Sequence, residues 1–271
     1  MKQITYPNYE IILVDNKSTD GSVEYFKRRF SEIEIIENEE NLGFAKGNNI
    51  GIKKALKNNA SYIFLLNNDT IVDPGFLEEL IKIGESDEKI GILSPIIYYY
   101  NDRNKVQYSG ERINLYTSKI KKINQEKRRV IDSDTICGAA MLIKKETIHK
   151  IGFLPTEYFM LWEDIDYSLK AKRNNIKNVY VENSKIWHKG SVSIGNISSP
   201  IRIKYSMRNR IIFCKKYCDK FQFFCFIINL LFIQIPIHFT IGVIKTSEKK
   251  KYITYFLDGI IEGIDYQFLN E

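Results

Sequence analysis

The stretch Tyr62-Ile63-Phe64-Leu65-Leu66-Asn67-Asn68-Asp69 decides the fold of this chain. An apolar run that gives way at once to polar residues is typical of a strand buried on both faces. The strand ends in two amides and a carboxylate, and in open α/β sheets ligands bind beyond the carboxyl ends of the strands. The stretch therefore predicts a buried strand with a candidate ligand site at its tip.

The flanking sequence repeats a strand–helix pattern. An apolar run ends at Asp15, and Ser18-Thr19-Asp20-Gly21-Ser22 is rich in residues that begin helices. We expect strands over residues 10–14, 34–36, 62–66, 139–143 and 179–181, and helices over residues 18–30, 47–58, 76–83, 146–151 and 164–173. Residues 101–134 read as a loop or hairpin insertion and residues 191–200 as a loop. The pattern predicts an α/β fold with a mainly parallel central sheet covered by helices.

A second informative stretch, Phe159-Met160-Leu161-Trp162-Glu163-Asp164-Ile165-Asp166, places two adjacent carboxylates at the start of a predicted helix. A carboxylate beside apolar groups is partly desolvated, which raises its pKa toward the value that a general base needs. Ordinary helix N-terminal charge is the alternative interpretation. The strand-end Asp69 and the late His188 favour the functional interpretation, which is metal-assisted chemistry on a phosphorylated substrate.

The composition indicates an anionic partner. The 271 residues carry a net charge of +7, with lysine and arginine clusters over residues 119–129 and 245–251. No nucleic-acid motif accompanies either cluster, so we expect no nucleic acid and instead a solvated or membrane-facing surface. The four cysteines contain no Cys-x-x-Cys pair, which favours reduced thiols, a cytosolic compartment and no zinc site.

Residues 221–244 contain no formal charge over 24 positions. That length could span a bilayer, although Gln222, Asn229, Gln234, Pro236 and His238 interrupt it. An in-plane interfacial helix pair or a hydrophobic docking segment fits at least as well, and a buried core helix is the third alternative. We expect a membrane-associated helical tail over residues 218–271.

Together these pieces resemble the inverting GT-A glycosyltransferases of family 2, especially the rhamnosyltransferase-like branch. The resemblance covers roughly residues 3–217. It rests on the order and spacing of several motifs, which are Val14-Asp15-Asn16, Asn41-Leu42-Gly43 through Asn49, Leu66-Asn67-Asn68-Asp69-Thr70, Gly138-Ala139, Glu163-Asp164-x-Asp166 with Arg173, His188-x-x-Gly190-x-Ser and Tyr205–Asn209.

The resemblance implies roles for the donor-side residues. Asp15 would contact the base or ribose of a nucleoside-diphosphate sugar, although a strand-end acid also suits a turn. Asn41, Gly43 and Asn49 would shape the nucleotide pocket, and Asn and Gly equally suit an ordinary turn. Asn67-Asn68-Asp69 stands where the family has its Asp-x-Asp metal motif. Asp69 would bind Mg²⁺ or Mn²⁺, and His188 would complete the metal shell, although an isolated histidine is more often structural.

The acceptor side is implied in the same way. Asp164 would be the general base that takes a proton from the acceptor hydroxyl during a single inverting displacement. Glu163 would contact the acceptor or the sugar, and Trp162 would offer an aromatic face to a sugar ring. A nucleotidyltransferase is a weaker interpretation, because the Gly-rich opening loop of such enzymes is absent.

We therefore expect a glycosyltransferase domain over residues 1–217. It would act at the cytosolic face of a membrane, peripheral or C-terminally anchored, on a glycan or lipid-linked acceptor in cell-surface polysaccharide synthesis. The alternative is a non-catalytic homologue that binds a sugar or a partner. The family begins with a strand and a helix before the region that matches Tyr6–Asp15, so we also expect this strand and helix to be missing and the chain to be poorly stable.

Overall fold

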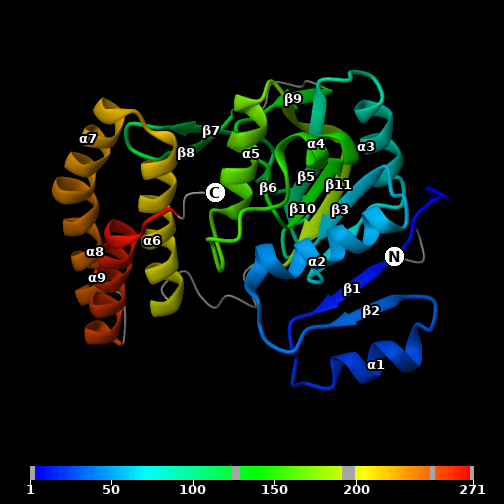
Figure 1. Cartoon of the computed structure of the whole chain (residues 1–271), viewed down its shortest axis with the longest axis horizontal. Coiled ribbons are helices and arrows are strands. Elements are labelled where there is room, and N and C mark those ends of the chain that lie inside the picture. Colours follow the sequence, from blue (N-terminus) through cyan, green and yellow to red (C-terminus); the bar gives the residue numbers. More distant parts are fainter. Residues whose placement is uncertain (1–3, 124–128, 191–198, 245–247, 269–271) are drawn as a thin grey trace. The chain divides into compact units, whose positions relative to one another are not determined.

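The computed structural model describes residues 4–123, 129–190, 199–244 and 248–268, which form two compact units (Figure 1). The first, which we call the sheet unit, comprises the residues up to Glu111 together with Lys122–Gly190. The second, the helical unit, comprises Arg112–Lys121 and the residues from Ser191 onward.

The sheet unit is built on a mixed seven-stranded sheet with the strand order β3-β10-β5-β11-β4, with β6 beside β5 and β9 beside β11. These strands are β3 (Tyr62–Leu66), β4 (Thr70–Val72), β5 (Ile90–Tyr99), β6 (Val106–Tyr108), β9 (Val130–Asp132), β10 (Ala140–Lys144) and β11 (Lys177–His188). Among the strands that the structure describes, β5 and β11 are the parallel pair of this sheet. The expectation of a mainly parallel sheet is therefore wrong, because β10 lies antiparallel between β3 and β5.

Helices cover both faces of this sheet. On one face lie α2 (Gly43–Lys57), α4 (Lys145–Ile151) and α5 (Glu163–Arg173), and on the other lies α3 (Phe76–Gly84). Because successive strand residues point to opposite faces, Ile92 and Ile96 of β5 pack under the first group and Leu93 and Ile97 pack under α3. The sheet is buried on both sides, which explains the apolar runs in its strands.

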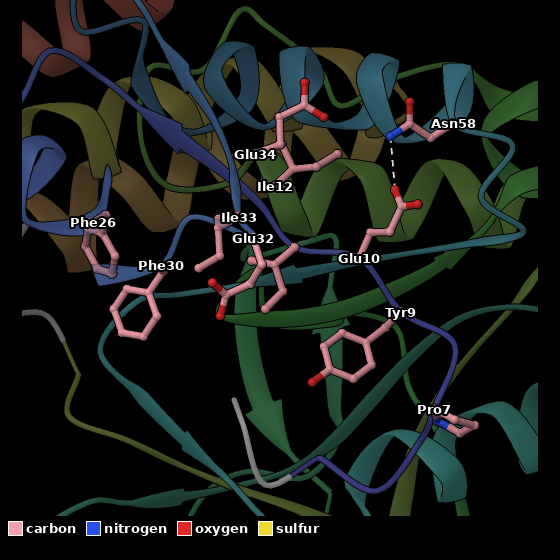
Figure 2. Close-up of a pocket in the computed structure, with 11 residues that line it drawn as sticks. Pro7, Tyr9, Glu10, Ile12, Phe26, Phe30, Glu32, Ile33, Glu34 and Asn58 are labelled. Atoms are coloured by element: carbon pink, nitrogen blue, oxygen red, sulfur yellow. Dashed lines mark hydrogen bonds between the residues drawn. The ribbon is translucent and has the colours of Figure 1, made fainter. Parts of the chain in front are cut away.

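The first two strands form a separate sheet. β1 (Ile12–Asp15) pairs in parallel with β2 (Glu34–Glu37), and α1 (Ser22–Arg29) connects them. Within the described ranges β1 has no second partner, and β3 is an edge strand of the larger sheet. A groove of about 760 Å³ lies along β1 (Figure 2); its lining includes Tyr9, Ile11, Ile12, Phe26, Phe30 and Ile33. The expectation that a strand beside β1 is missing stays a prediction.

The helical unit contains a hairpin and a set of helices. The elements are β7 (Glu111–Asn114), β8 (Lys119–Lys122), α6 (Pro200–Tyr217), α7 (Lys220–Asn229), the π-helical turn η1 (Leu230–Gln234), α8 (Ile235–Ile244) and α9 (Lys249–Asp265). α6 and α9 pack so closely that a Cβ atom at Gly259 would lie 2.4 Å from the Lys204 carbonyl oxygen. The expected boundary after residue 217 does not coincide with the two units, since α6 groups with α9.

Two further expectations concern the loops and the late strand. The hairpin β7–β8 lies within the expected insertion 101–134, of which residues 124–128 fall outside the described residues. Of the expected loop 191–200, residues 191–198 also fall outside them. The short strand expected at 179–181 is part of the 12-residue β11, which continues to His188 and so carries this histidine to the edge of the candidate site.

Candidate functional site

Asp69 and His188 are brought together by two antiparallel strands. Asp69 precedes the first residue of β4, and β11 ends at His188, which lies opposite Thr70 in the register of the two strands. The Lys189 N–H donates a hydrogen bond to the Asp69 carbonyl oxygen at 3.0 Å. As a result, the two side chains lie next to each other, although 118 residues separate them in sequence.

The facing atoms of this pair have no hydrogen-bond partner. His188 Nε2 lies 3.1 Å from Asp69 Oδ1, and the side chains are 8% and 16% exposed. Both atoms are buried and unsatisfied. The other ring nitrogen, Nδ1, lies 3.1 Å from Gln107 Oε1. In the neutral imidazole tautomer that donates its Nδ1 hydrogen to this glutamine oxygen, Nε2 keeps a free lone pair. In that tautomer two buried acceptors face one another, and a shared cation or proton would satisfy both.

A divalent cation fits this donor set. A carboxylate oxygen and an imidazole nitrogen are ordinary metal ligands, and a histidine ligand whose second nitrogen is held by an outer partner is typical of metal sites. The described residues contain no cluster of three or more His, Cys, Asp or Glu side chains that could enclose an ion. A cation held by this pair would take its remaining ligands from a substrate or from water.

Asp164 is fixed by the main chain at the start of α5. The Gly138 N–H donates to Asp164 Oδ2 and the Ile165 N–H donates to Oδ1, each at 2.8 Å. Leu161 and Trp162, just before the helix, both have positive φ angles, of 68° and 77°. Backbone in this region is strained for residues other than glycine and often marks a functional site.

Glu163, which is buried, and Asp164, which is partly buried, form an adjacent acid pair. Glu163 is 6% exposed and its Oε2 has no hydrogen-bond partner. Burial, reinforced by the charge of Asp164, raises the pKa of Glu163 well above its ordinary value. Burial also raises the pKa of Asp164, while the N–H groups of Gly138 and Ile165 offset part of that rise. Both effects increase the affinity of the pair for a proton.

A short chain of backbone contacts links Asp164 to the strand-end acid. The Asn67 N–H donates to the Ala139 carbonyl oxygen at 3.0 Å, and the neighbouring Gly138 binds Asp164. Asn67 and the exposed Asn68 belong to the turn that leads from β3 to Asp69. The ends of β3 and β11 and the starts of β4, β10 and α5 therefore meet at one place in the sheet unit.

The stretch from Asn41 to Asn49 contacts the segment that precedes α5. Gly43 has a φ angle of 75°, and a Cβ atom there would lie 2.3 Å from the Phe159 carbonyl oxygen. The side chain of Asn41 accepts from the Gly43 N–H. Asn49 is buried, and its amide both donates to the Leu154 carbonyl oxygen at 2.9 Å and accepts from the Leu154 N–H at 3.0 Å. These contacts fix the position of the segment that leads into α5 and the acid pair.

Asp15 lies at the end of β1, where its Oδ2 accepts from the Ser18 N–H at 2.9 Å. The neighbouring Asn16 joins β1 to α2, because its Nδ2 donates to the Gly43 carbonyl oxygen at 3.1 Å. Asn16 Oδ1 also accepts from Asn38. This network connects the end of the small sheet to the same stretch that contacts Phe159.

Two details of the site did not follow from the sequence. Gln107, which contacts His188, lies within a polar stretch that carries no motif. Only the pairing of β6 with β5 places it near the Asp69–His188 pair. Trp162 is 8% exposed, so little of its ring is open to a sugar in this structure. Its expected stacking role stays a prediction.

Comparison with known proteins identifies the class to which this fold and site belong. The sequence profile of Glycosyl transferase family 2 matches residues 1–152. The match covers more than half of the chain, so the chain belongs to this family. It is therefore a glycosyltransferase of the GT-A fold, and the non-catalytic alternative is not favoured.

The chain is similar to several individual glycosyltransferases. The chain is 24% identical over 263 residues to the low-salt glycan biosynthesis hexosyltransferase Agl10 of Haloferax volcanii, covering 94% of this chain and 82% of that protein. It is 24% identical over 272 residues to the dTDP-rhamnosyl transferase RfbF of Shigella flexneri, covering 93% and 86%. The crystal structure of GalNAc-T7 with UDP, GalNAc and Mn²⁺ has a similar fold, with a TM-score of 0.63 at 16% identity over 94% of this chain and 51% of that one.

Proposed function

We propose that this chain transfers a sugar from a nucleoside-diphosphate sugar to a hydroxyl group of a glycan or lipid-linked acceptor, with inversion at the anomeric carbon. The main support is the connection between the Asp69–His188 pair, whose facing atoms have no hydrogen-bond partner, and the partly buried carboxylate of Asp164. The Asp69–His188 pair would hold a cation for the leaving diphosphate, and Asp164 would take the proton of the acceptor hydroxyl. A single displacement requires both.

Asp69 and His188 would hold Mg²⁺ or Mn²⁺. The cation would supply positive charge to the diphosphate, making it a better leaving group. Gln107 would orient the His188 ring by accepting from Nδ1, which leaves Nε2 for the cation. Asn67 and Asn68, on the turn before Asp69, would contact the donor. Structural relatives that contain Mn²⁺ are consistent with this assignment.

Asp164 would act as the general base. Each of its oxygens accepts one backbone N–H and retains a lone pair for the acceptor hydroxyl. In the reaction the hydroxyl proton moves to Asp164, and the acceptor oxygen forms a bond to the anomeric carbon. The bond from that carbon to the diphosphate oxygen breaks, releasing the nucleoside diphosphate. Because burial raises the pKa of Asp164, it accepts this proton more readily than an exposed aspartate would.

The residues around the base would position the two substrates. The unpartnered Oε2 of Glu163 can accept a hydrogen bond from an acceptor hydroxyl, with Trp162 beside it. On the donor side, Asp15 would contact the ribose or base. Asn41, Gly43 and Asn49 would shape the nucleotide pocket by holding the segment before α5, since their contacts reach Phe159 and Leu154.

The chain would work at the cytoplasmic face of a membrane in cell-surface polysaccharide synthesis. Within the described residues, one helical run, Lys220–Gly242, is long and apolar enough to cross a membrane by length and composition. This run and the basic clusters support a membrane-bound acceptor.

A panel of nucleoside-diphosphate sugars tests this function. We expect one donor to raise the unfolding temperature of the purified chain more with Mn²⁺ than with a chelator, and the nucleoside diphosphate to be released from that donor when acceptor is added. Binding that is insensitive to metal, or release of a nucleoside monophosphate in place of the diphosphate, would contradict the proposal.

A further inference from the structure

The helical unit exposes a large apolar surface on α7, η1 and α8, drawn in orange in Figure 1. The side chains of Phe224 and Phe232 are 60% and 75% exposed. The exposed set on these elements includes Phe221, Phe224, Ile228, Leu231, Phe232 and Ile237. Contiguous exposed apolar surface of this kind marks an interaction site with an apolar partner.

The opposite side of the same run is buried within the helical unit and combines apolar side chains, Phe226 and Leu230, with polar ones. Gln234 is buried and its Oε1 accepts from Arg210 of α6 at 3.3 Å, while its Nε2 donates to Asn229 at 3.4 Å. His238 Nδ1 lies 2.9 Å from the hydroxyl of Tyr252 on α9. In water an amphipathic helix turns its polar side outward. Here the outward face is apolar and polar side chains are buried, so the outer face is suited to a hydrocarbon environment.

The helical unit also carries the positive charge of the chain. It contains 14 lysines and arginines and 6 aspartates and glutamates, a net charge of +8, against +7 for the whole chain. The sheet unit is therefore close to neutral. Lysines and arginines near the membrane are attracted to anionic lipid headgroups. Basic charge beside exposed apolar surface fits an anionic bilayer.

The packing of the unit argues against a transmembrane orientation of this run. Its polar side is bonded to α6 and α9, so a spanning run would carry these helices into the hydrocarbon. α6 carries Lys204, Arg208 and Arg210, and α9 carries Asp258 and Glu262. Glu262 pairs with Lys204 at 2.7 Å, with side chains that are partly exposed to water. Charged side chains are costly at the bilayer centre.

We infer that α7, η1 and α8 lie flat in one leaflet of an anionic membrane, with their outer face in the acyl region and the flanking lysines at the headgroups. This deepens the proposed function, on which it rests for the idea of a lipid-linked acceptor. Such monotopic binding would hold the whole chain at the surface where that acceptor lies.

Vesicle flotation of the full chain without substrates tests the binding, so its outcome does not depend on transfer activity. We expect binding to vesicles of phosphatidylcholine mixed with phosphatidylglycerol and weaker binding to phosphatidylcholine alone. The double variant Phe224→Ser/Phe232→Ser should bind roughly tenfold or more weakly. The control Tyr25→Ser, which alters an exposed aromatic residue of α1, should bind like the wild type.

Single tryptophans distinguish the orientations. We expect Phe221→Trp, Phe232→Trp and Ile237→Trp to be quenched to the same shallow depth by brominated lipids, after subtraction of the wild-type signal. A deep Phe232→Trp between shallow ends would show a spanning helix and overturn the inference.

A second copy of the chain is the other occupant to be tested. The inference would also be overturned if the chain bound no vesicle and instead formed a dimer that the Phe224→Ser/Phe232→Ser variant does not form. The triple variant Lys249→Gln/Lys250→Gln/Lys251→Gln should lose the preference for anionic lipid while keeping its unfolding temperature.

Discussion

His188 Nε2 lies 3.1 Å from Asp69 Oδ1, yet neither atom has a hydrogen-bond partner. When the imidazole is neutral with its hydrogen on Nδ1, its Nε2 and the carboxylate oxygen are both acceptors, and a cation between them would satisfy both. Asp69→Ala and His188→Ala should each weaken Mn²⁺-dependent donor binding by more than the roughly 10–100-fold typical of losing an outer partner. Calorimetry with and without Mn²⁺ measures this. The exposed His149→Ala is the control, and normal Mn²⁺ binding by His188→Ala would make His188 structural.

Gln107 should tune the same site without touching the metal. Gln107→Leu removes the acceptor for His188 Nδ1, and we expect metal affinity to fall by about 10–100-fold. Gln107→Glu keeps an acceptor oxygen and should restore most of that affinity. Equal Mn²⁺ affinity in Gln107→Leu and wild type would show that the contact has no role in orienting the imidazole.

Asp164→Asn should lower transfer by roughly 10²–10⁴-fold, because the amide cannot take the acceptor proton. The amide NH₂ would face one of the two backbone N–H donors, so some stability is also lost. Donor affinity and urea unfolding must therefore be measured beside the turnover. Asp166→Asn is the control: this buried acid on the same helix accepts from the Tyr158 hydroxyl at 2.8 Å, and folded protein should stay active. Wild-type turnover in Asp164→Asn would exclude it as the base.

Glu163 should make stability depend on pH. Its pKa is raised in the folded chain, so between the ordinary value of 4.5 and the raised value the folded state binds more protons than the unfolded state. The free energy of unfolding therefore falls as pH rises through this window, by at most about 1.4 kcal/mol per pH unit. Glu163→Gln should be more stable than the wild type at pH 8, and the difference should shrink toward pH 4.

Urea unfolding across this pH range provides the measurement. The exposed Glu146→Gln should leave the pH dependence unchanged. A stability gain in Glu163→Gln that is the same at every pH would contradict the assignment to titration.

Gly43→Ala should destabilise the chain and displace the segment before α5. The left-handed backbone alone costs about 1–2 kcal/mol with a side chain. Gly21 has nearly the same φ angle, 77°, but nothing lies within 4 Å of its added Cβ, whereas the Cβ at Gly43 meets Phe159. Gly21→Ala is thus a matched control, and the difference in unfolding free energy isolates the contact. We expect weaker donor binding in Gly43→Ala alone; equal loss in both variants would remove Gly43 from the pocket.

Much of the local structure follows from the sequence, because strand and helix periodicity depend on near neighbours. The strand Tyr62–Leu66 has the expected bounds, and the acid pair stands at the start of a helix as expected. The order of the motifs also identified the family. These features need no knowledge of which strands pair.

Only the tertiary structure decided how these pieces meet, because sheet pairing and long-range hydrogen bonds join residues far apart in the chain. The antiparallel β10 made the sheet mixed, and β11 continued to His188 beside Asp69. Gln107 reaches His188 from 81 residues away. The orientation of η1 and α8 likewise depends on Gln234 meeting Arg210 and on His238 meeting Tyr252. An apolar run by itself has no preferred side; the buried polar partners decide which face is left for solvent or lipid.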